Sequence, residues 1–283
     1  MATIDAHAHL WDRRRFDYAW LDQEPALPAV FLPGDLTTSG EASADRYVFV
    51  QAGCRRDQGV AEAAWVQTLD GPTQRLAGIV AFAPLEDADC ESTLDALADV
   101  GSVVGVRRLL QDEPDEFFAD AGLGRGLDAL DRRGWTFDAC VRWPQLGALS
   151  QLARSHDGLP IVLDHLGKPP IGSSDESAFA RWRILLEQFA ELPNCAVKLS
   201  GLPAELGTSA GESAYGPWLR AAFDRFGPER AMIGTDWPVS GGAGISRDDW
   251  FCVVKDATGA SGSEWAAISM TTAARFYSLP SLT

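Results

Sequence analysis

The sequence predicts an α/β fold, a (β/α)8 barrel. Eight short runs rich in Val, Ile, Leu and Ala recur at fairly even spacing, and amphipathic segments lie between them. Such alternation over 283 residues favours parallel strands that are buried on both faces. The hydrophobic content of 46% is sufficient for one large core, so we expect one domain over residues 1–283.

The expected strands share a short apolar run followed by polar residues. They are Thr3–His7, Tyr47–Gln51, Gly78–Phe82, Val103–Arg107, Thr136–Val141, Pro160–Asp164, Cys195–Leu199 and Ala231–Thr235. The expected helices are Gln58–Leu69, Cys90–Ala98, Leu123–Arg133, Gln145–Ser155, Ala178–Leu192, Tyr215–Phe226, Arg247–Ala257 and Ser263–Tyr277. A doubly wound sheet is the alternative. A nucleotide-binding sheet of that kind would usually carry a glycine fingerprint after its first strand, where this chain has AHAHLWD.

Residues 11–44 form the longest stretch without helical or strand periodicity, and they are rich in Pro, Asp and aromatic residues. In a (β/α)8 barrel the loops that follow the strands surround the active site. Because this stretch follows the first expected strand, we expect it to overhang that face of the barrel as a lid.

The composition excludes several classes of protein. The chain has 24 basic and 40 acidic residues, a formal charge of −16, which disfavours binding to nucleic acid or to a membrane surface. We see no basic leader and no apolar run of membrane-spanning length, and we expect a cytoplasmic protein. Five scattered cysteines without CxxC spacing argue against a disulfide scaffold or a zinc knuckle. The sequence leaves a homo-oligomer open.

A histidine pair ends the first expected strand. His7 and His9 are two residues apart, so in an extended strand both side chains point to the same side. Two imidazoles that converge at a strand end can hold a divalent metal ion or polarise a carbonyl oxygen. The alternative is a pair of ordinary polar residues leaving a strand.

Other polar residues stand at the carboxyl ends of the expected strands, where the chemistry of a (β/α)8 barrel takes place. They are Gln51, Arg107, Arg108, Asp138, Cys140, Arg142, Asp164, His165, Lys168, Lys198, Ser200, Asp236 and the adjacent Trp237. With His7 and His9, three of the four histidines fall at strand ends, which favours a shared site over ordinary polar residues.

The cations of this set each allow two interpretations. For Arg107 we favour hydrogen bonding of its guanidinium group to a substrate oxygen. The alternative is an ion pair with an acidic neighbour such as Asp138. Lys168 either reaches the substrate or is a solvated loop lysine. Lys198 lies inside an apolar strand, where an unpaired charge is costly. We therefore expect it to face the polar mouth of the barrel or to pair with a carboxylate.

Two acidic residues and several tryptophans complete the candidate set. Asp164 should point away from His165, and we expect Asp164 and Asp5 to be structural. Four tryptophans lie just past strand ends or in the expected lid: Trp11, Trp20, Trp143 and Trp237. They either pack in the core or form aromatic walls, which would suit the apolar C–H faces of a sugar ring.

Six sequence blocks resemble a known family. IDAHAHLWD, GVRRLLQDEPDEFF, FDACVRWPQL, PIVLDHLGKPPI, CAVKLSGL and RAMIGTDWPVS are similar to the signatures of amidohydrolase-superfamily lactonases, and the resemblance runs from Ile4 to about Tyr277. The most similar branch acts on sugar-acid lactones such as fucono-, rhamnono- and galactono-lactone. Related branches act on 2-pyrone-4,6-dicarboxylate and sulfomuconolactone. The resemblance implies a distorted (β/α)8 TIM barrel of the amidohydrolase type.

The resemblance also assigns site residues. It matches His7, His9 and His165 to positions that bind a metal ion or polarise the substrate carbonyl. It matches Asp236 to the acid–base carboxylate, which is also a candidate metal ligand, and Arg107 to the arginine of the fourth strand. The bridging lysine or glutamate and the fifth-strand histidine of two-metal members are missing, which argues against a two-metal site. The resemblance leaves open one divalent ion, with zinc as the expected metal, or a metal-independent site.

The resemblance implies hydrolysis of a sugar-derived γ- or δ-lactone to its hydroxy acid, a reaction of carbohydrate metabolism. Asp236 is the expected base and returns its proton to the ring oxygen, while the three imidazoles polarise the carbonyl, directly or through one ion. Arg107, Lys168, Trp11 and Trp237 are expected to bind the substrate. The alternatives are a dicarboxylate or muconolactone-type lactonase, a non-oxidative decarboxylase, and a catalytically silent binding protein.

Overall fold

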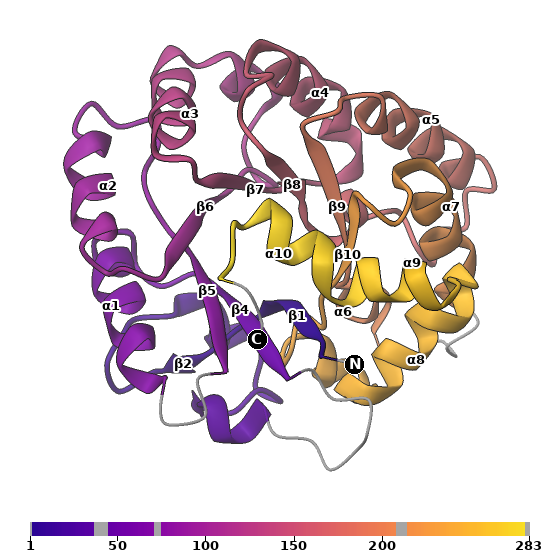
Figure 1. Ribbon diagram of the computed structural model, residues 1–283, viewed down its shortest axis with the longest axis horizontal. Helices are drawn as coiled ribbons and strands as arrows, with labels where there is room; N and C mark the ends of the chain where they lie inside the picture. Colours follow the sequence, from indigo (N-terminus) through magenta and orange to yellow (C-terminus); the bar gives the residue numbers. More distant parts are fainter. Residues whose placement is uncertain (1, 37–44, 71–74, 208–213, 281–283) are drawn as a thin grey trace.

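The barrel predicted from the sequence is confirmed by the computed structural model, which describes residues 2–36, 45–70, 75–207 and 214–280. Eight parallel strands form one sheet in the order β1-β4-β5-β6-β7-β8-β9-β10, with helices around it (Figure 1). The strands are β1 (Ile4–Ala8), β4 (Arg46–Val50), β5 (Leu76–Ala81), β6 (Val103–Leu109), β7 (Thr136–Cys140), β8 (Ile161–Leu163), β9 (Cys195–Leu199) and β10 (Ala231–Ile233). Each overlaps one of the expected runs.

Seven of the expected helices are present with shifts of a few residues at their ends. They are α1 (Gly59–Leu69), α2 (Cys90–Ala98), α3 (Ala121–Arg133), α4 (Leu146–Ser155), α5 (Ala178–Ala190), α7 (Gly216–Phe226) and α8 (Arg247–Thr258). The helix expected at the end of the chain is divided into α9 (Gly262–Ala266), a π-helical turn (Ala267–Thr271) and α10 (Thr272–Phe276). The short helix α6 (Leu202–Leu206) was not expected, because five residues are too few to show a helical period.

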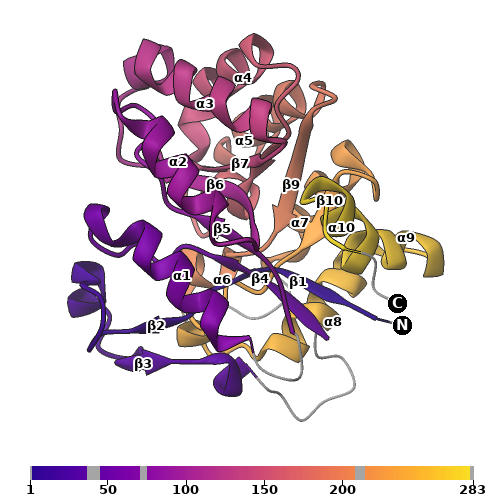
Figure 2. The ribbon, with the colours of Figure 1, turned by 60° about the vertical axis from the view of Figure 1, so that its left-hand side comes forward.

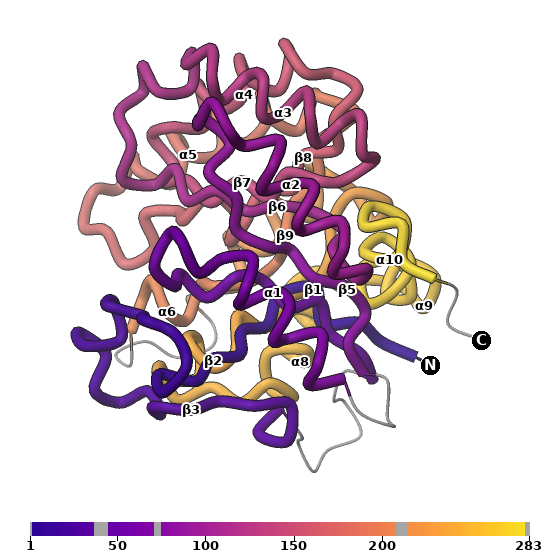
Figure 3. Tube along the Cα trace, turned by 90° about the vertical axis from the view of Figure 1, so that its left-hand side faces the viewer, coloured from indigo at the N-terminus to yellow at the C-terminus, as the bar shows by residue number. Residues whose placement is uncertain are grey.

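The two ends of the barrel are covered by different segments (Figures 2 and 3). At the end where the strands begin, α10 lies across the barrel, and α9 lies beside α8 (Figure 1). At the other end lie α6 and a small antiparallel sheet of β2 (Trp11–Asp12) and β3 (Val30–Phe31). The first part of the expected lid is therefore at the C-terminal face. Residues 37–44 of that segment lie outside the described residues.

Two apolar layers hold the barrel together. Helices pack on the outside of the sheet through buried stripes, such as Leu123, Leu127 and Leu130 of α3, which are fully buried at helical spacing. A second cluster, including Ile4 of β1 and Phe276 of α10, packs where α10 crosses the barrel. None of the helices among the described residues is both long and apolar enough to span a membrane.

The barrel closes differently between β1 and β10 than elsewhere. Every other neighbouring pair of strands forms a parallel ladder, whereas β1 and β10 are the two ends of the strand order, and only an isolated bridge between Ala8 and Trp237 is described near them. The His9 amide donates to the Trp237 carbonyl at 2.9 Å, and the Asp236 amide donates to the His7 carbonyl at 2.8 Å. A Cβ at Gly234 would lie 2.6 Å from the Cβ of His7, so this close approach requires glycine.

Candidate active site

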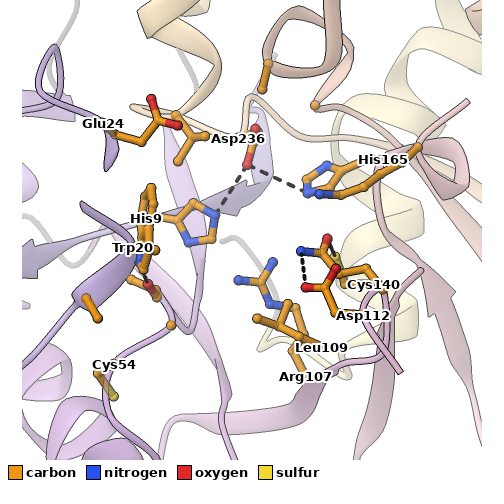
Figure 4. Close-up of a pocket in the computed structure, with 18 of the residues that line it drawn as sticks. His9, Trp20, Glu24, Cys54, Arg107, Leu109, Asp112, Cys140, His165 and Asp236 are labelled. Atoms are coloured by element: carbon orange, nitrogen blue, oxygen red, sulfur yellow. Dashed lines mark hydrogen bonds and ion pairs between the residues drawn. The ribbon is translucent and has the colours of Figure 1, made fainter. Parts of the chain in front are cut away.

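A cavity of about 660 Å³ opens at the C-terminal face of the barrel. Its inner wall includes His9, Arg107, His165 and Asp236, which come from four different strand ends (Figure 4). Trp20, from the segment that follows β2, lines its outer part. Residues far apart in the chain therefore meet in one cavity, as the barrel prediction required.

The Asp236 carboxylate lies between two imidazoles (Figure 4). Its Oδ1 is 3.3 Å from Nε2 of His9 and 3.7 Å from Nε2 of His165, and also 3.7 Å from Nε2 of His7. His9 Nδ1 lies 2.8 Å from the Val50 carbonyl, which can only accept, so the ring proton is on Nδ1. His9 Nε2 thus presents a lone pair to Oδ1 of Asp236. Two acceptor atoms this close together are stable only when a proton, another hydrogen-bond donor or a metal cation lies between them.

The donor atoms of His7, His9 and Asp236 fit one tetrahedral metal ion. Their Nε2, Nε2 and Oδ1 atoms are separated by 3.2, 3.3 and 3.7 Å. Ligands at the usual zinc bond lengths lie about 3.3 Å apart in a tetrahedron. Among the described residues a second group, His7, Asp164 and His165, also brings three donor atoms within 4.8 Å of one another. The described groups therefore place His165 with His7 and Asp164, although Nε2 of His165 also lies 3.7 Å from Oδ1 of Asp236.

A turn with left-handed backbone places His165. The strand β8 ends at Leu163, and His165 and Leu166 have φ values of 54° and 56° in the following 3₁₀ turn. Alternation no longer applies there, so the prediction that Asp164 points away from His165 is wrong: both side chains reach His7. A Cβ at residue 201 would lie 2.4 Å from the His165 ring, so Gly201 makes room for it.

Beneath the imidazoles lies a fully buried group of charges, the interior cluster, formed by Asp138, Asp164, Lys198 and Tyr277. Lys198 Nζ is 2.5 Å from Oδ2 of Asp138 and 3.0 Å from Oδ1 of Asp164, so the predicted carboxylate pairing of Lys198 is confirmed. The Tyr277 hydroxyl donates to Asp138 at 2.7 Å. Nδ1 of His7 lies 3.1 Å from Lys198 and 3.3 Å from Asp164, so the cluster holds the His7 ring from below.

These surroundings set the protonation states. Burial, and then the charge of Lys198, lower the pKa of His7 well below its usual value. Burial also lowers the pKa of His165 to about 4. Burial by itself would raise the pKa of Asp236, but His165, His9 and His7 together hold it below the usual range. At neutral pH the site therefore holds Asp236 as an ionised carboxylate, the form that can accept a proton, beside neutral His7 and His165 rings.

Arg107 lies between the cavity and the interior cluster. Its Nη1 is 3.3 Å from Nε2 of His7 and 3.4 Å from Oδ2 of Asp164, and its Nη2 donates to the Gln51 carbonyl. The ion pair considered from the sequence therefore exists, with Asp164 in place of Asp138. Arg107 also lines the cavity, so the two interpretations are compatible.

Lys168 lines the cavity together with an acidic residue that the sequence analysis missed. Nζ of Lys168 is 3.2 Å from Oε1 of Glu205, and both side chains are less than a quarter exposed, at 17% and 24%. Glu205 belongs to α6, the unexpected helix. The available signal was an acidic residue soon after the end of the seventh strand, on the face where the site lies.

The structure does not bring Trp11 or Trp237 to the cavity wall. Trp11 is fully buried, and its indole donates to the Pro28 carbonyl at 2.8 Å and packs on Trp20. The Trp237 ring lies against Gly241. Trp20 itself lines the cavity and donates to the Ala52 carbonyl at 2.7 Å, so it takes the place expected for Trp11.

The cavity carries more negative than positive charge. Its acidic side chains are Asp17, Glu24, Asp112, Glu205 and Asp236, and its basic ones are Arg55, Arg107 and Lys168. All three cations are paired with carboxylates in the structure. The cavity therefore offers hydrogen-bond donors and acceptors, but no excess of positive charge for a ligand with two carboxylates.

Comparisons with known proteins show the family and the fold. The amidohydrolase family model matches residues 4–279. An L-fucono-1,5-lactonase of Burkholderia multivorans is 35% identical over 98% of this chain and 96% of its own length. A crystal structure of an amidohydrolase from Burkholderia multivorans with bound zinc is 33% identical, with a TM-score of 0.87 over 99% of this chain and 100% of that one. A putative 2-pyrone-4,6-dicarboxylic acid hydrolase of Pseudomonas putida, at 22% identity and a TM-score of 0.70 over 98% and 97% of the two chains, shares the fold.

Proposed function

Since the chain belongs to the amidohydrolase family, we propose that it is a lactonase that opens a neutral sugar-derived lactone to the hydroxy acid. The substrate class is an aldono-1,4- or 1,5-lactone such as fucono-, rhamnono- or galactono-lactone. The observation that carries the proposal is the ionised Asp236 carboxylate between His9 and His165, at the bottom of an open cavity. The similarity to an L-fucono-1,5-lactonase supports the same class of substrate.

In the proposed reaction Asp236 takes a proton from a water molecule, and the oxygen of that water bonds to the lactone carbonyl carbon. The carbonyl re-forms as the bond from this carbon to the ring oxygen breaks, and Asp236 returns the proton to the ring oxygen. One water is consumed and one hydroxy acid is formed, and this acid releases a proton to the solution.

Two neighbours stabilise the negative charge that develops on the carbonyl oxygen. Nδ1 of His165 lies 2.9 Å from Oγ of Ser200, and a Ser200 hydroxyl that donates there leaves the ring proton on Nε2, facing Asp236 and the cavity. The guanidinium of Arg107 supplies a permanent positive charge in the same wall.

One divalent metal ion fits this site. His7, His9 and Asp236 would hold it, and the zinc-bound relative supports zinc as the metal. When bound, the ion supplies Lewis-acid polarisation of the carbonyl oxygen and lowers the pKa of water. We propose at most one ion per chain, because the second group, His7, Asp164 and His165, shares His7 with the first, and the charge of Lys198 lies 3.0 Å from Oδ1 of Asp164.

The charge balance of the cavity favours a neutral lactone over the alternative dicarboxylate lactones. A dicarboxylate needs unpaired cations, whereas Arg107 and Lys168 are already paired with Asp164 and Glu205. A neutral polyol instead needs adjacent donors and acceptors, which the Lys168–Glu205 pair provides, and Trp20 offers an apolar face. Cytoplasmic location, a role in carbohydrate metabolism and a homo-oligomer stay predictions from the sequence.

The test is a pH-indicator assay over a panel of aldonolactones, with and without a chelator, corrected for spontaneous hydrolysis. We expect acid release without CO2 from at least one neutral lactone, and none above background from 2-pyrone-4,6-dicarboxylate. Asp236→Asn should lower kcat by about 10³-fold, because an amide cannot accept the proton. Asp224→Asn, at an exposed carboxylate of α7, is the matched control. Release of CO2, or an Asp236→Asn variant as fast as this control, would overturn the proposal.

A further inference from the structure

We propose that Asp5 is a positioning residue that closes the barrel between β1 and β10 and thereby sets the distance from Asp236 to the imidazoles of His7 and His9. This inference rests on the proposed role of Asp236 as the base. At this junction an isolated bridge joins Ala8 to Trp237, whereas hydrogen-bonded ladders join the other neighbouring strands.

The Asp5 side chain adds hydrogen bonds at this junction to the two backbone hydrogen bonds between residues 7–9 and 236–237. Its Oδ1 accepts from the backbone amide of His7 at 3.1 Å and from that of Thr235 at 2.9 Å. One carboxylate oxygen therefore joins the backbones of two chain segments that are 230 residues apart. Both amides lie next to site residues: one belongs to His7, and the other immediately precedes Asp236.

The second carboxylate oxygen completes the junction. Oδ2 of Asp5 accepts from the Thr235 hydroxyl at 2.5 Å and from Nη2 of Arg247 at 2.9 Å. Asp5 is fully buried and Arg247 is 1% exposed, so neither group can exchange these partners for water. Because Arg247 also donates to the Leu36 carbonyl, the junction is tied to the segment that follows β3.

This junction fixes the backbone from which the base projects. Asp236 is held with φ at 56°, a left-handed conformation that a non-glycine residue adopts only where the surroundings require it. Its amide donates to the His7 carbonyl, and the Thr235 hydroxyl also lies 3.3 Å from the Trp237 amide. Without the Thr235–Asp5 contacts, the turn that carries Asp236 loses one of its attachments to β1 and keeps the backbone hydrogen bonds that join Asp236 to His7 and Trp237 to His9. Asp236 would then shift relative to His7 and His9.

Substituting Asp5 itself is a poor test, because it would leave the buried Arg247 without its partner and could prevent folding. Thr235→Val is sharper: it keeps the shape of the side chain and removes only the hydroxyl. Thr235→Ser restores the hydroxyl. Thr272→Val is the matched control, since the Thr272 hydroxyl is equally buried and donates to the Pro228 carbonyl at 2.7 Å, before the start of β10.

The experiment measures kcat and KM on the best lactone, together with hydrogen exchange of peptides covering residues 4–9 and 232–238. For Thr235→Val we expect a kcat lower by about tenfold or more, since misplacement of a reacting group by about 1 Å can cost about 100-fold. KM should stay within about twofold, and both peptides should exchange faster. Thr235→Ser should keep kcat within about twofold of the wild type, and Thr272→Val should change neither kcat nor these peptides.

Each other result is informative. Unchanged exchange in Thr235→Val would show that the hydrogen bond from the Thr235 hydroxyl to Asp5 does not hold the junction. Faster exchange with unchanged kcat would show that the junction does not position the base. Either result overturns the inference. If the wild type turned over no lactone, the proposed function would fail separately, because the exchange measurement requires no substrate and would still decide the structural role of the junction.

Discussion

The interior cluster and the mouth of the cavity both contain a lysine paired with carboxylates, but in different surroundings. Lys198 and its two partners, Asp138 and Asp164, have no exposed side-chain surface. Lys168 and Glu205 remain partly exposed. A buried charge that loses its partner cannot be solvated, whereas an exposed one can. From this comparison we expect the interior cluster to contribute to stability and to the position of His7, and the mouth to contribute to substrate binding.

The largest expected effect is on stability, at the interior cluster. Lys198→Met leaves two carboxylates close together in the interior, so we expect the free energy of unfolding to fall by about 3–5 kcal/mol. Denaturant unfolding measures this change. Adding Asp138→Asn removes one of the stranded charges and should recover part of the loss.

Arg183→Met is the control for this prediction. Arg183 pairs with Glu187 on the surface of α5, where its side chain is 48% exposed, and its loss should cost less than about 1 kcal/mol. If Lys198→Met were no more destabilising than Arg183→Met, the distinction between interior and mouth would be broken.

A carboxyl group outside both regions sharpens the comparison. Glu62 of α1 is almost fully buried, and burial raises its pKa to about 7 from an ordinary value of 4.5. The folded protein then holds this proton more tightly than the unfolded chain, so the stability contribution is greatest below pH 4.5 and falls as the pH rises to about 7. The total decrease is about 3 kcal/mol.

Glu62→Gln should remove this decrease. We expect the variant to gain about 3 kcal/mol on the wild type between pH 4 and pH 8, measured by denaturant unfolding at both values. Comparing the same two proteins at both pH values cancels the titration of all other groups. A stability difference that is independent of pH would mean that Glu62 is ionised in the folded protein.

The smallest expected effect is at the mouth. Lys168→Met should raise KM for the lactone by about tenfold, because the substrate loses one hydrogen bond from a charged donor. We expect kcat to change by less than about threefold. The free energy of unfolding should change by less than about 1 kcal/mol. Steady-state kinetics over a range of lactone concentrations separates the two constants.

Glu205→Gln supplies the comparison for Lys168→Met. An amide still accepts a hydrogen bond from Lys168 or from a substrate hydroxyl, so KM should rise by less than in Lys168→Met. A loss of folding in either variant would place this pair with the interior cluster and contradict the distinction between the two regions.

The sequence predicts most of this architecture because strand and helix periods are local properties. All eight strands appear where apolar runs end in polar residues, and the strand-end rule brings His9, Arg107, His165 and Asp236 to one cavity. Local periodicity, however, cannot identify contacts between distant segments. Glu205 was missed because α6 is only five residues long, and Trp20 replaced Trp11 because the path of a long irregular segment is set by tertiary packing.

The orientation of Asp164 was a different kind of error. Strand alternation predicts the side of a residue only while the backbone stays extended, and the chain leaves β8 one residue before Asp164. The long-range partners of Asp5 could not be predicted either. They are contributed by residues 235 and 247, far along the chain. Polar junctions of this kind form only when the barrel closes, and the pattern of residues along the sequence does not indicate which distant residues closure brings together.

The excess of carboxylates around the cavity bears on how a turnover ends. An uncharged ring would enter without electrostatic hindrance, but its opened form is an anion in a pocket with five acidic and three basic side chains. Repulsion would then speed departure of the product and keep product inhibition weak. At an ionic strength of about 0.1 M, salt screens the repulsion between charges that are more than about 10 Å apart. Added salt would therefore weaken the repulsion and strengthen inhibition by the hydroxy acid.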